Sequence, residues 1–382
     1  MRLHHKAIVE LLTHELLLPH FVLHYCDRKV REGSGSAHGV RDRAMVYEYA
    51  DALERAFSAL AARPFSLPPP QKPVPVYVFD TATLFPDGGA PFTSEDTEGS
   101  PYIGLPSRTH EPTVRAEIDR ATASAVHEVA HVFCMSRRPL REPHSAVWAW
   151  FAEATAVFTE WLVLPGNPDT LRFAAGWCDW PETPLDHKSA WYEAGMFVRY
   201  LARRCGQGLL REVWMASDER ETPIEALVRS LSKKDWSGFF SDYAMDSYFL
   251  WDPASRGFAP DVYGRYGERA VQESFGLRPS ASLALQGTLD HLACRYYRIY
   301  LAEGVAGLEC QLVQSCGCKL QARMAVVTAE KRRDCDQLLP QAGAALLQAD
   351  PRRTDHVVLA VVNAGHAPGD DGLPYELGVR AF

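Results

Sequence analysis

The sequence has no long apolar run and no strong excess of one charge. Its 382 residues include 40 Lys and Arg against 48 Asp and Glu, a net charge of -8, without a long block of either sign. A nucleic-acid groove or an anionic membrane surface attracts concentrated positive charge, so we expect neither as a partner. The apolar patches near the start are interrupted by His14, Glu15 and His20 before they reach the length of a membrane span, so no span is expected.

The sequence also lacks a paired cysteine framework. Nine Cys is an odd number, and they are scattered from position 26 to position 335, which favours buried or free thiols. Cys316 and Cys318 are the one tight pair, but their spacing is too short for a zinc knuckle and no second pair completes it. No small-residue cleavage site follows the first apolar patches, so no export signal is visible.

What the sequence does have is a change of pattern along its length. Apolar residues recur at helical spacing from about residue 5 to 62, and "VPVYVFD" at 74–80 and "PYIGLPS" at 101–107 are two short strand candidates around a loop rich in Gly and Asp. Residues from 111 to about 275 are mostly helical in pattern. From about 280 onward, β-branched and aromatic runs alternate with turns, which predicts a β-sandwich.

One motif with metal-binding spacing lies in the helical part. The segment "RAEIDRATASAVHEVAHVFCM" contains no Gly or Pro and includes His127, Glu128 and His131 in the order H-E-x-x-H. A helix places the two imidazoles one turn apart on one face, where they can hold one Zn²⁺. Glu128 lies beside that position, and a purely structural zinc site would not need it, so Glu128 is the candidate general base. A chance match in a helical core is the alternative.

A catalytic zinc site requires a third protein ligand. The next predicted helix, "SAVWAWFAEATAVFTEWLVL" at 145–164, carries Glu153 among aromatic residues, where a buried carboxylate is costly unless it is paired or binds a metal. We therefore expect Glu153 to be the third ligand, unless it lies on the solvent side of an amphipathic helix. Glu160, near the same face, is either exposed or hydrogen-bonded to a zinc-bound His. His144, in the preceding loop, is a rival third ligand.

These residues resemble the gluzincin zinc metallopeptidases, in which H-E-x-x-H is followed by a helix similar to "WFAEATAVF" here. The metzincin continuation is excluded, because Cys134 and Arg137 stand where Gly and His are needed. Downstream, "WYEAGMFVRYL" at 191–201 is similar to the Y-E-K-G helix of the zinc aminopeptidases in that clan. The resemblance implies that Tyr192 donates to the oxyanion of the transition state. A packing role for Tyr192, or donation from His187 instead, stays open.

The sequence departs from the aminopeptidases at the strand before the motif. Their strand carries a Glu that holds the free amino group of the substrate, whereas "SPYIGLPSR" here contains no carboxylate. An endopeptidase, or a peptidase with another specificity, therefore fits better than an aminopeptidase, and an extended peptide could pair with the edge of the 101–107 strand. The layout also resembles a bacterial group of secreted gluzincin-like metallopeptidases, which implies export. Since the sequence shows no signal, we leave localisation open.

Together these observations predict an α+β protein with two domains. A mostly helical gluzincin-like domain is expected over residues 1–275, followed by the β-sandwich over 280–382. The first domain would contain a helical lead-in (1–70), a small sheet (74–107), the zinc helices (111–205) and a helical subdomain (206–275).

The expected function is hydrolysis of a peptide or protein substrate by a water activated on one Zn²⁺. In this scheme His127, His131 and Glu153 are the ligands and Glu128 is the base. The alternative is a non-catalytic zinc-containing protein whose sandwich recognises a protein or glycan partner.

Overall fold

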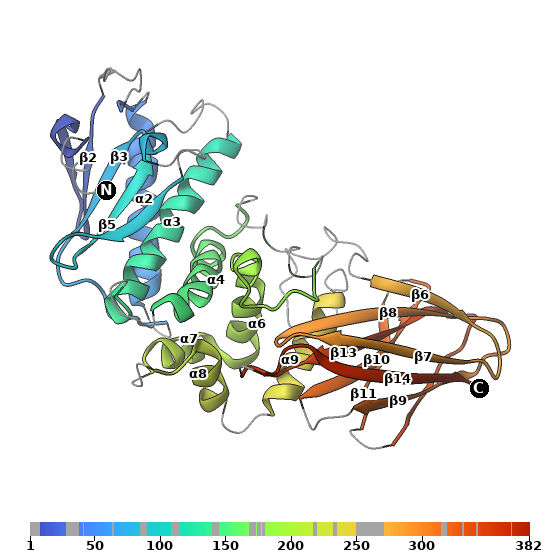
Figure 1. The fold of residues 1–382 in the computed structure, drawn as a ribbon. Helices are drawn as coiled ribbons and strands as arrows, with labels where there is room; N and C mark the ends of the chain where they lie inside the picture. Colours follow the sequence, from blue (N-terminus) through green and yellow to red (C-terminus); the bar gives the residue numbers. More distant parts are fainter. Residues whose placement is uncertain are drawn as a thin grey trace. The chain divides into compact units, whose positions relative to one another are not determined.

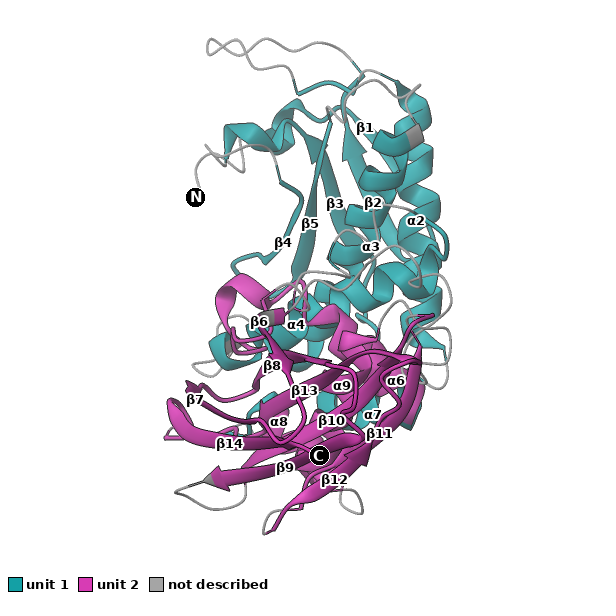
Figure 2. Ribbon diagram, turned by 90° about the vertical axis from the view of Figure 1, so that its right-hand side faces the viewer, with its two compact units in different colours: residues 1–173, 205–223 teal, residues 174–204, 224–382 magenta. Residues whose placement is uncertain are grey.

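The computed structural model describes residues 8–27, 38–40, 42–62, 65–84, 90–107, 115–139, 145–167, 173, 177, 180–216, 220–231, 235–249, 271–314, 319–330, 332–340, 343–367 and 369–382. Contacts divide the chain into two compact units, unit 1 (1–173 and 205–223) and unit 2 (174–204 and 224–382), coloured separately in Figure 2. Helices and three mostly antiparallel sheets occur together, which confirms the α+β class. Of the helices described, none has both the length and the apolar character that membrane crossing requires.

Unit 1 is built on a five-stranded sheet in the order β1-β2-β3-β5-β4. The β2–β3 and β3–β5 pairs are parallel, whereas β1 and β4 run antiparallel at the two edges. Both strands expected from the sequence therefore lie inside the sheet. The strands are β1 (His14–Leu17), β2 (Phe21–Tyr25), β3 (Val74–Phe79), β4 (Phe92–Glu95) and β5 (Pro101–Pro106).

Residues 14–25 form an antiparallel hairpin where the sequence pattern predicted a helix. Pro19 lies between the two strands and cannot continue a helix. In β2 the side chains of Phe21 and Leu23 are fully buried, whereas that of Val22 between them is only partly buried. This alternation is the two-residue period of a strand. The helical prediction is correct further on, where α2 (Arg43–Ala61) begins after an Asp42 side chain that accepts a hydrogen bond from the helix.

The longer helices described in unit 1 are α2, α3 (Arg115–Arg137), α4 (Ser145–Val163) and α7 (Gln207–Trp214), with helical residues at 8–11 and a short 3₁₀ turn at Thr81–Thr83. α2 and α3 lie side by side on the sheet, and α4 packs against both (Figure 1). The buried ring of Trp214 lies 5.2 Å from that of Trp148 and 5.5 Å from that of Phe151, so α7 packs on the aromatic side of α4. This packing holds α4 in a defined rotation.

Unit 2 contains two sheets that share one hydrophobic core. Their strand orders are β11-β10-β13-β8-β6 and β12-β9-β14-β7, and β6–β8 is the parallel pair among otherwise antiparallel ones. Side chains from both sheets form the core cluster. The strands are β6 (Val271–Leu277), β7 (Ser282–Leu289), β8 (Ala293–Leu301), β9 (Gly307–Gln314), β10 (Leu320–Thr328), β11 (Arg333–Leu338), β12 (Ala345–Gln348), β13 (Thr354–Asn363) and β14 (Leu373–Ala381). The sheet region thus begins at Val271, ahead of the expected start at 280.

The helices α6 (Gly195–Cys205), α8 (Pro223–Ser230) and α9 (Trp236–Tyr248) accompany these sheets, after a short 3₁₀ turn at Lys188–Ala190. α9 lies on β10 and β13, and the Trp236 indole Nε1 donates to the backbone oxygen of Ala364 over 2.9 Å. Grouping by contact therefore places α9 with the strands, whereas the sequence pattern assigned it to the first domain.

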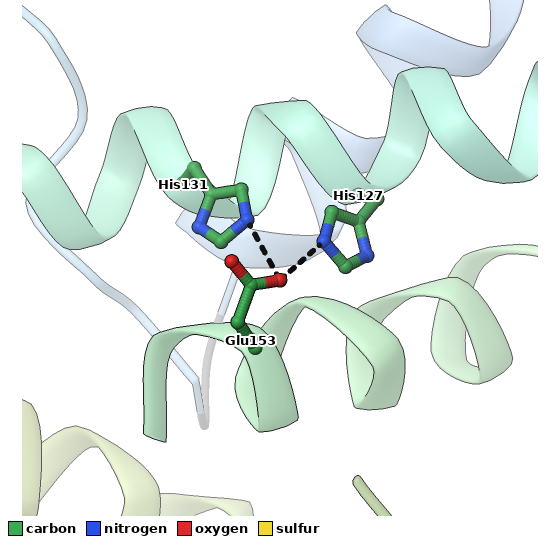
Figure 3. A group of neighbouring side chains, drawn as sticks. All are labelled: His127, His131 and Glu153. Atoms are coloured by element: carbon green, nitrogen blue, oxygen red, sulfur yellow. Dashed lines mark hydrogen bonds and ion pairs between the residues drawn. The ribbon is translucent and has the colours of Figure 1, made fainter. Parts of the chain in front are cut away.

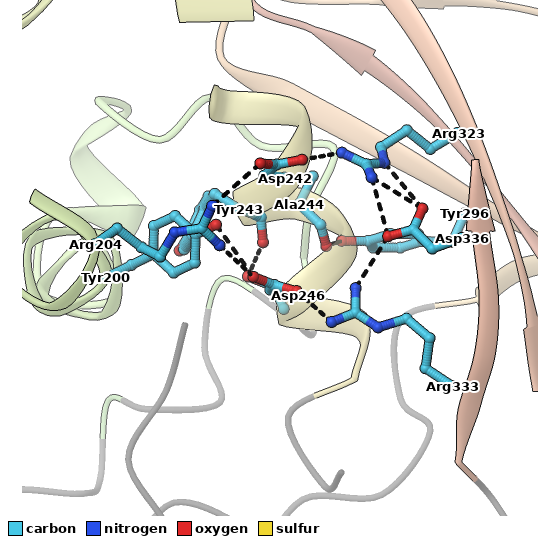
Figure 4. A network of polar contacts seen from close by, with 11 residues as sticks. Tyr200, Arg204, Asp242, Tyr243, Ala244, Asp246, Tyr296, Arg323, Arg333 and Asp336 are labelled. Carbon is cyan, nitrogen blue, oxygen red and sulfur yellow. Dashed lines mark hydrogen bonds and ion pairs between the residues drawn. The ribbon is translucent and has the colours of Figure 1, made fainter. Parts of the chain in front are cut away.

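A polar network on one side of α9 ties this helix to its neighbours in unit 2 (Figure 4). Asp246 of α9 accepts hydrogen bonds from Arg333 of β11, over 2.7 Å, and from the Tyr200 hydroxyl of α6, over 3.1 Å. One helical turn earlier, Asp242 pairs with Arg323 of β10 and, over 3.4 Å, with Arg204 of α6. Partly buried charges are costly unless they are paired, so the network favours one fit of α6, α9 and this sheet.

Candidate metal centre

Three side chains predicted as metal ligands converge in unit 1. Their ligand atoms, from His127, His131 and Glu153, all lie within 4.8 Å of one another. Glu153 Oε2 is 3.0 Å from His127 Nε2 and 3.4 Å from His131 Nε2 (Figure 3). This group can hold a metal ion, because two imidazole nitrogens and a carboxylate oxygen point at one position.

Two helices produce this convergence. On α3 the rings of His127 and His131 lie one turn apart, with centroids 4.8 Å from each other. α4 faces them and brings Glu153 into the space between the two rings (Figure 3). Glu153 is partly buried rather than exposed on the solvent side of its helix, since its side chain keeps 21% of its accessible surface.

A second carboxylate of α4 contacts the first ligand from behind. Glu160 Oε1 is 2.7 Å from His127 Nδ1, and the Glu160 side chain is 1% exposed. An ionised carboxylate can only accept hydrogen bonds. The Nδ1 atom of His127 therefore carries a proton and donates a hydrogen bond to Glu160. Glu153 and Glu160 are seven positions apart on one helix face, and His127 lies between the two carboxylates. The open question about Glu160 is thereby answered: it is hydrogen-bonded to a ligand of the candidate site.

The electrostatics of this group favour a positive charge. Burial by itself would lower the pKa of His127, but the hydrogen bonds to Glu153 and Glu160 outweigh it and raise the pKa to about 10. Burial by itself would raise the pKa of Glu153. The neighbouring His131 and His127 outweigh this effect and hold the pKa of that carboxyl well below its usual range. A proton on His127 balances the carboxylates in the metal-free chain. A divalent cation would replace that proton on binding.

The candidate base, Glu128, is buried and is not one of the three converging ligands. Its carboxylate accepts a hydrogen bond from the Thr93 hydroxyl, with Thr93 Oγ1 2.7 Å from Glu128 Oε2. Thr93 belongs to β4, in a segment that the sequence pattern assigned to a loop. Sequence reasoning missed this contact because four residues are too few for a clear strand pattern.

The strand expected to receive a substrate is not at a sheet edge, so that expectation was wrong. β5 pairs with β3 on one side and with β4 on the other. β4 is the edge strand on this side of the sheet. The short segment at 92–95 takes the edge because the chain folds back on β5 through the turn at 96–100.

The remaining sequence candidates lie elsewhere. His144, Cys316 and Cys318 fall outside the described residues. Tyr192 and His187 belong to unit 2, whereas the His–Glu group belongs to unit 1. Tyr192 is 40% exposed, and the His187 side chain accepts a hydrogen bond from the Ser189 backbone N–H over 3.3 Å. Their roles as oxyanion donors stay predictions.

A family model, described as a family of unknown function (DUF6055), matches residues 113–299, just under half of the chain. The match begins ahead of α3, includes both helices of the candidate metal centre and ends within β8. It therefore includes elements of both compact units. The comparison with curated proteins produced no match.

Solved structures match only part of the chain. The pre-peptidase C-terminal domain of a collagenase from Bacillus anthracis is 15% identical, with a TM-score of 0.21 over 28% of this chain and 93% of that one. A periplasmic inhibitor of g-type lysozyme from Aeromonas hydrophila is 12% identical, with a TM-score of 0.21 over 29% of this chain and 99% of that one. Likenesses this weak carry no argument about function.

Proposed function

We propose that this protein is a zinc-dependent peptidase of the gluzincin type, in which a peptidase-like helical part is joined to a β-sandwich. The observation that carries the proposal is the convergence of His127 Nε2, His131 Nε2 and Glu153 Oε2 from two facing helices. Zinc sites that catalyse hydrolysis use three protein ligands of these kinds and keep one position for water or substrate.

The separations of Glu153 Oε2 from the two imidazole nitrogens fit the proposed ion, and the three ligand atoms all lie within 4.8 Å of one another. A tetrahedral zinc with ligands at about 2.0 to 2.2 Å separates its ligand atoms by about 3.3 to 3.6 Å. The two measured separations from Glu153 Oε2, 3.0 and 3.4 Å, lie within a few tenths of an ångström of this range. The donor set of two imidazoles and one carboxylate also suits zinc better than calcium or magnesium, which prefer oxygen ligands alone.

Each neighbouring side chain has a role in this proposal. Glu160 accepts a hydrogen bond from the Nδ1–H of His127, which leaves Nε2 as the free ligand atom and fixes the plane of the ring. Glu128 takes a proton from the attacking water and delivers it to the leaving amine. The Thr93 hydroxyl donates to Glu128 Oε2 and so helps to hold the carboxylate in one orientation. A bound zinc ion would polarise the scissile carbonyl and lower the pKa of water.

The proposed substrate is an extended peptide cleaved internally. β4 supports this choice because an edge strand has backbone groups available for pairing with another chain. Thr93, from the same strand, contacts Glu128, so a peptide paired along β4 would run past the proposed base. Tyr192, or His187 in its place, would donate to the oxyanion.

The decisive experiment is the metal content of the purified protein, compared with Glu153→Ala and Glu128→Gln. We expect about one Zn²⁺ in the wild type, loss of zinc in Glu153→Ala and retention in Glu128→Gln. A peptide library would then be cleaved by the wild type and not by Glu128→Gln. A protein that holds no metal after incubation with zinc contradicts the proposal outright. Zinc without any cleavage would instead support the non-catalytic zinc-containing protein.

A further inference from the structure

A pocket lies within unit 2, and none of its lining residues belongs to the candidate metal centre. Its volume is about 320 Å³, and it is lined by Trp177, Trp180, Thr183, Ser189, Ala190 and Glu193. The Trp177 ring is buried and its indole Nε1 donates to the backbone oxygen of Thr183 over 3.2 Å. Trp180 is 73% exposed, which is unusual for so large an apolar side chain. The pocket thus combines two indole rings with one carboxylate.

Glu193 is the charged group of this pocket. It is partly buried, and that burial raises the pKa of its carboxyl above the ordinary value. Its own backbone N–H is the donor that acts on the carboxylate. Across the described parts of the chain, no Lys, Arg or His forms an ion pair with it. Among those described residues no positive charge offsets the partial desolvation of this carboxylate, and the arrival of a cation would do so.

The segment that forms the pocket is held against the strands of the same unit. The Cys294 backbone N–H donates to the Pro181 oxygen over 2.7 Å. His291 bridges from Asp186, at 2.9 Å, to Asp371, at 2.5 Å. These bonds lie on both sides of the turn at 182–185 and hold that turn, which includes the lining residue Thr183, in place. A pre-ordered site avoids part of the entropic cost of binding.

We propose that this pocket binds a positively charged alkylammonium group, such as the side chain of a lysine or the amino terminus of a peptide. The exposed Trp180 indole can attract a cation through its π-electrons, and the Glu193 carboxylate supplies the opposite charge. The volume suits one amino-acid side chain rather than a large cofactor. A neutral ligand would leave the Glu193 charge uncompensated. This binding proposal does not depend on the proposed peptidase activity.

The test compares three small probes on the full chain in the presence of a chelator, so that amine binding to a metal does not contribute. Nα-acetyl-lysine amide has a side-chain ammonium, Nα-acetyl-norleucine amide is its uncharged counterpart, and leucine amide has only the terminal ammonium. Binding is followed by saturation-transfer NMR. We expect saturable binding of a charged probe, roughly tenfold or more tighter than that of the norleucine probe. The stronger of the two charged probes identifies the source of the ammonium.

Two variants assign the binding to this pocket. Glu193→Gln and Trp180→Ala should each weaken the charged probe by roughly tenfold. Trp180 is largely exposed, so its replacement leaves the core intact. Glu273→Gln, which neutralises an exposed carboxylate on β6, is the control and should change nothing. Equal binding of the norleucine probe, unaltered binding in Glu193→Gln, or the absence of saturable binding by any probe would overturn the proposal.

Discussion

Replacing Glu160 by Gln tests whether the hydrogen bond behind His127 controls metal binding. Gln has the same size, so the buried space stays filled, and its amide oxygen can still accept from His127 Nδ1 over the 2.7 Å observed for Glu160. What the variant loses is the negative charge. A charge-assisted hydrogen bond is roughly twice as strong as a neutral one. The imidazole therefore becomes a weaker donor to the metal, and its orientation is held less firmly.

The expected magnitude follows from the behaviour of carboxylates that hydrogen-bond to metal-binding histidines. Their loss weakens metal affinity by about 10- to 100-fold, or about 1.4 to 2.7 kcal/mol. Because Glu160 is 1% exposed, solvent does not screen the interaction, and we expect a value toward the upper end. Glu153→Gln removes a ligand itself and should weaken binding further than Glu160→Gln.

The assay is a zinc competition titration against a chromophoric chelator at fixed pH. Thr159→Val is the matched control, because Thr159 neighbours Glu160 on α4, is equally buried, and its hydroxyl bonds to the Thr155 oxygen rather than to a ligand. Circular dichroism confirms that each variant is folded. Glu160→Asp supplies a second variant that keeps the charge but withdraws it by one methylene. Wild-type zinc affinity in both folded Glu160 variants would refute the reasoning.

Three further predictions concern other parts of the molecule. Tyr192→Phe should retain zinc and lower the rate of peptide cleavage by about 10²- to 10³-fold; full activity on a confirmed substrate would remove Tyr192 from the mechanism. Gly104→Ala should lower the free energy of unfolding by about 1 to 2 kcal/mol in urea denaturation, because its new Cβ would lie 2.3 Å from the Phe92 ring; Gly276→Ala, with no atom within 4 Å, is the control. The hydrogen bond to Asp186, together with that to Asp371, outweighs burial and raises the pKa of His291 to about 9. The protonated His291 therefore contributes fully to stability below about pH 6.5, and this contribution is lost as the pH rises through 9. The difference in unfolding free energy between His291→Gln and wild type should therefore be present at about pH 6 and shrink toward pH 10; an equal difference at both values contradicts this assignment.

Much of the candidate metal centre could be predicted from the sequence because helix geometry converts spacing into position. His127 and His131 are one helical turn apart, and the Ala-rich segment around them, which contains no Gly or Pro, predicts a helix. Glu153 stood out because a carboxylate among aromatic residues is costly without a partner. Both arguments use local properties of the chain, and the structure brings these three side chains together.

The sequence pattern failed where the element was short or the pattern ambiguous. The hairpin at 14–25 has apolar residues that suit a helix nearly as well as a strand, and Pro19 together with pairing to β3 selects the strand. β4 has four residues, so its formation depends on β5 beside it. The predicted domain boundary near residue 275 follows the change in sequence pattern. That pattern contains no information on the packing of α9 against β10 and β13.

The sequence by itself determined the α+β class and the residue types that meet at the candidate metal centre, because helical period and charge burial are local constraints. Only the tertiary structure decided that Glu160 lies behind His127, that Thr93 holds Glu128, and that β4 rather than β5 is the edge strand. Each of these contacts joins residues 33 or more positions apart or depends on which strand pairs with which. Long-range pairing is chosen by the packing of the whole unit, which no short stretch of sequence contains.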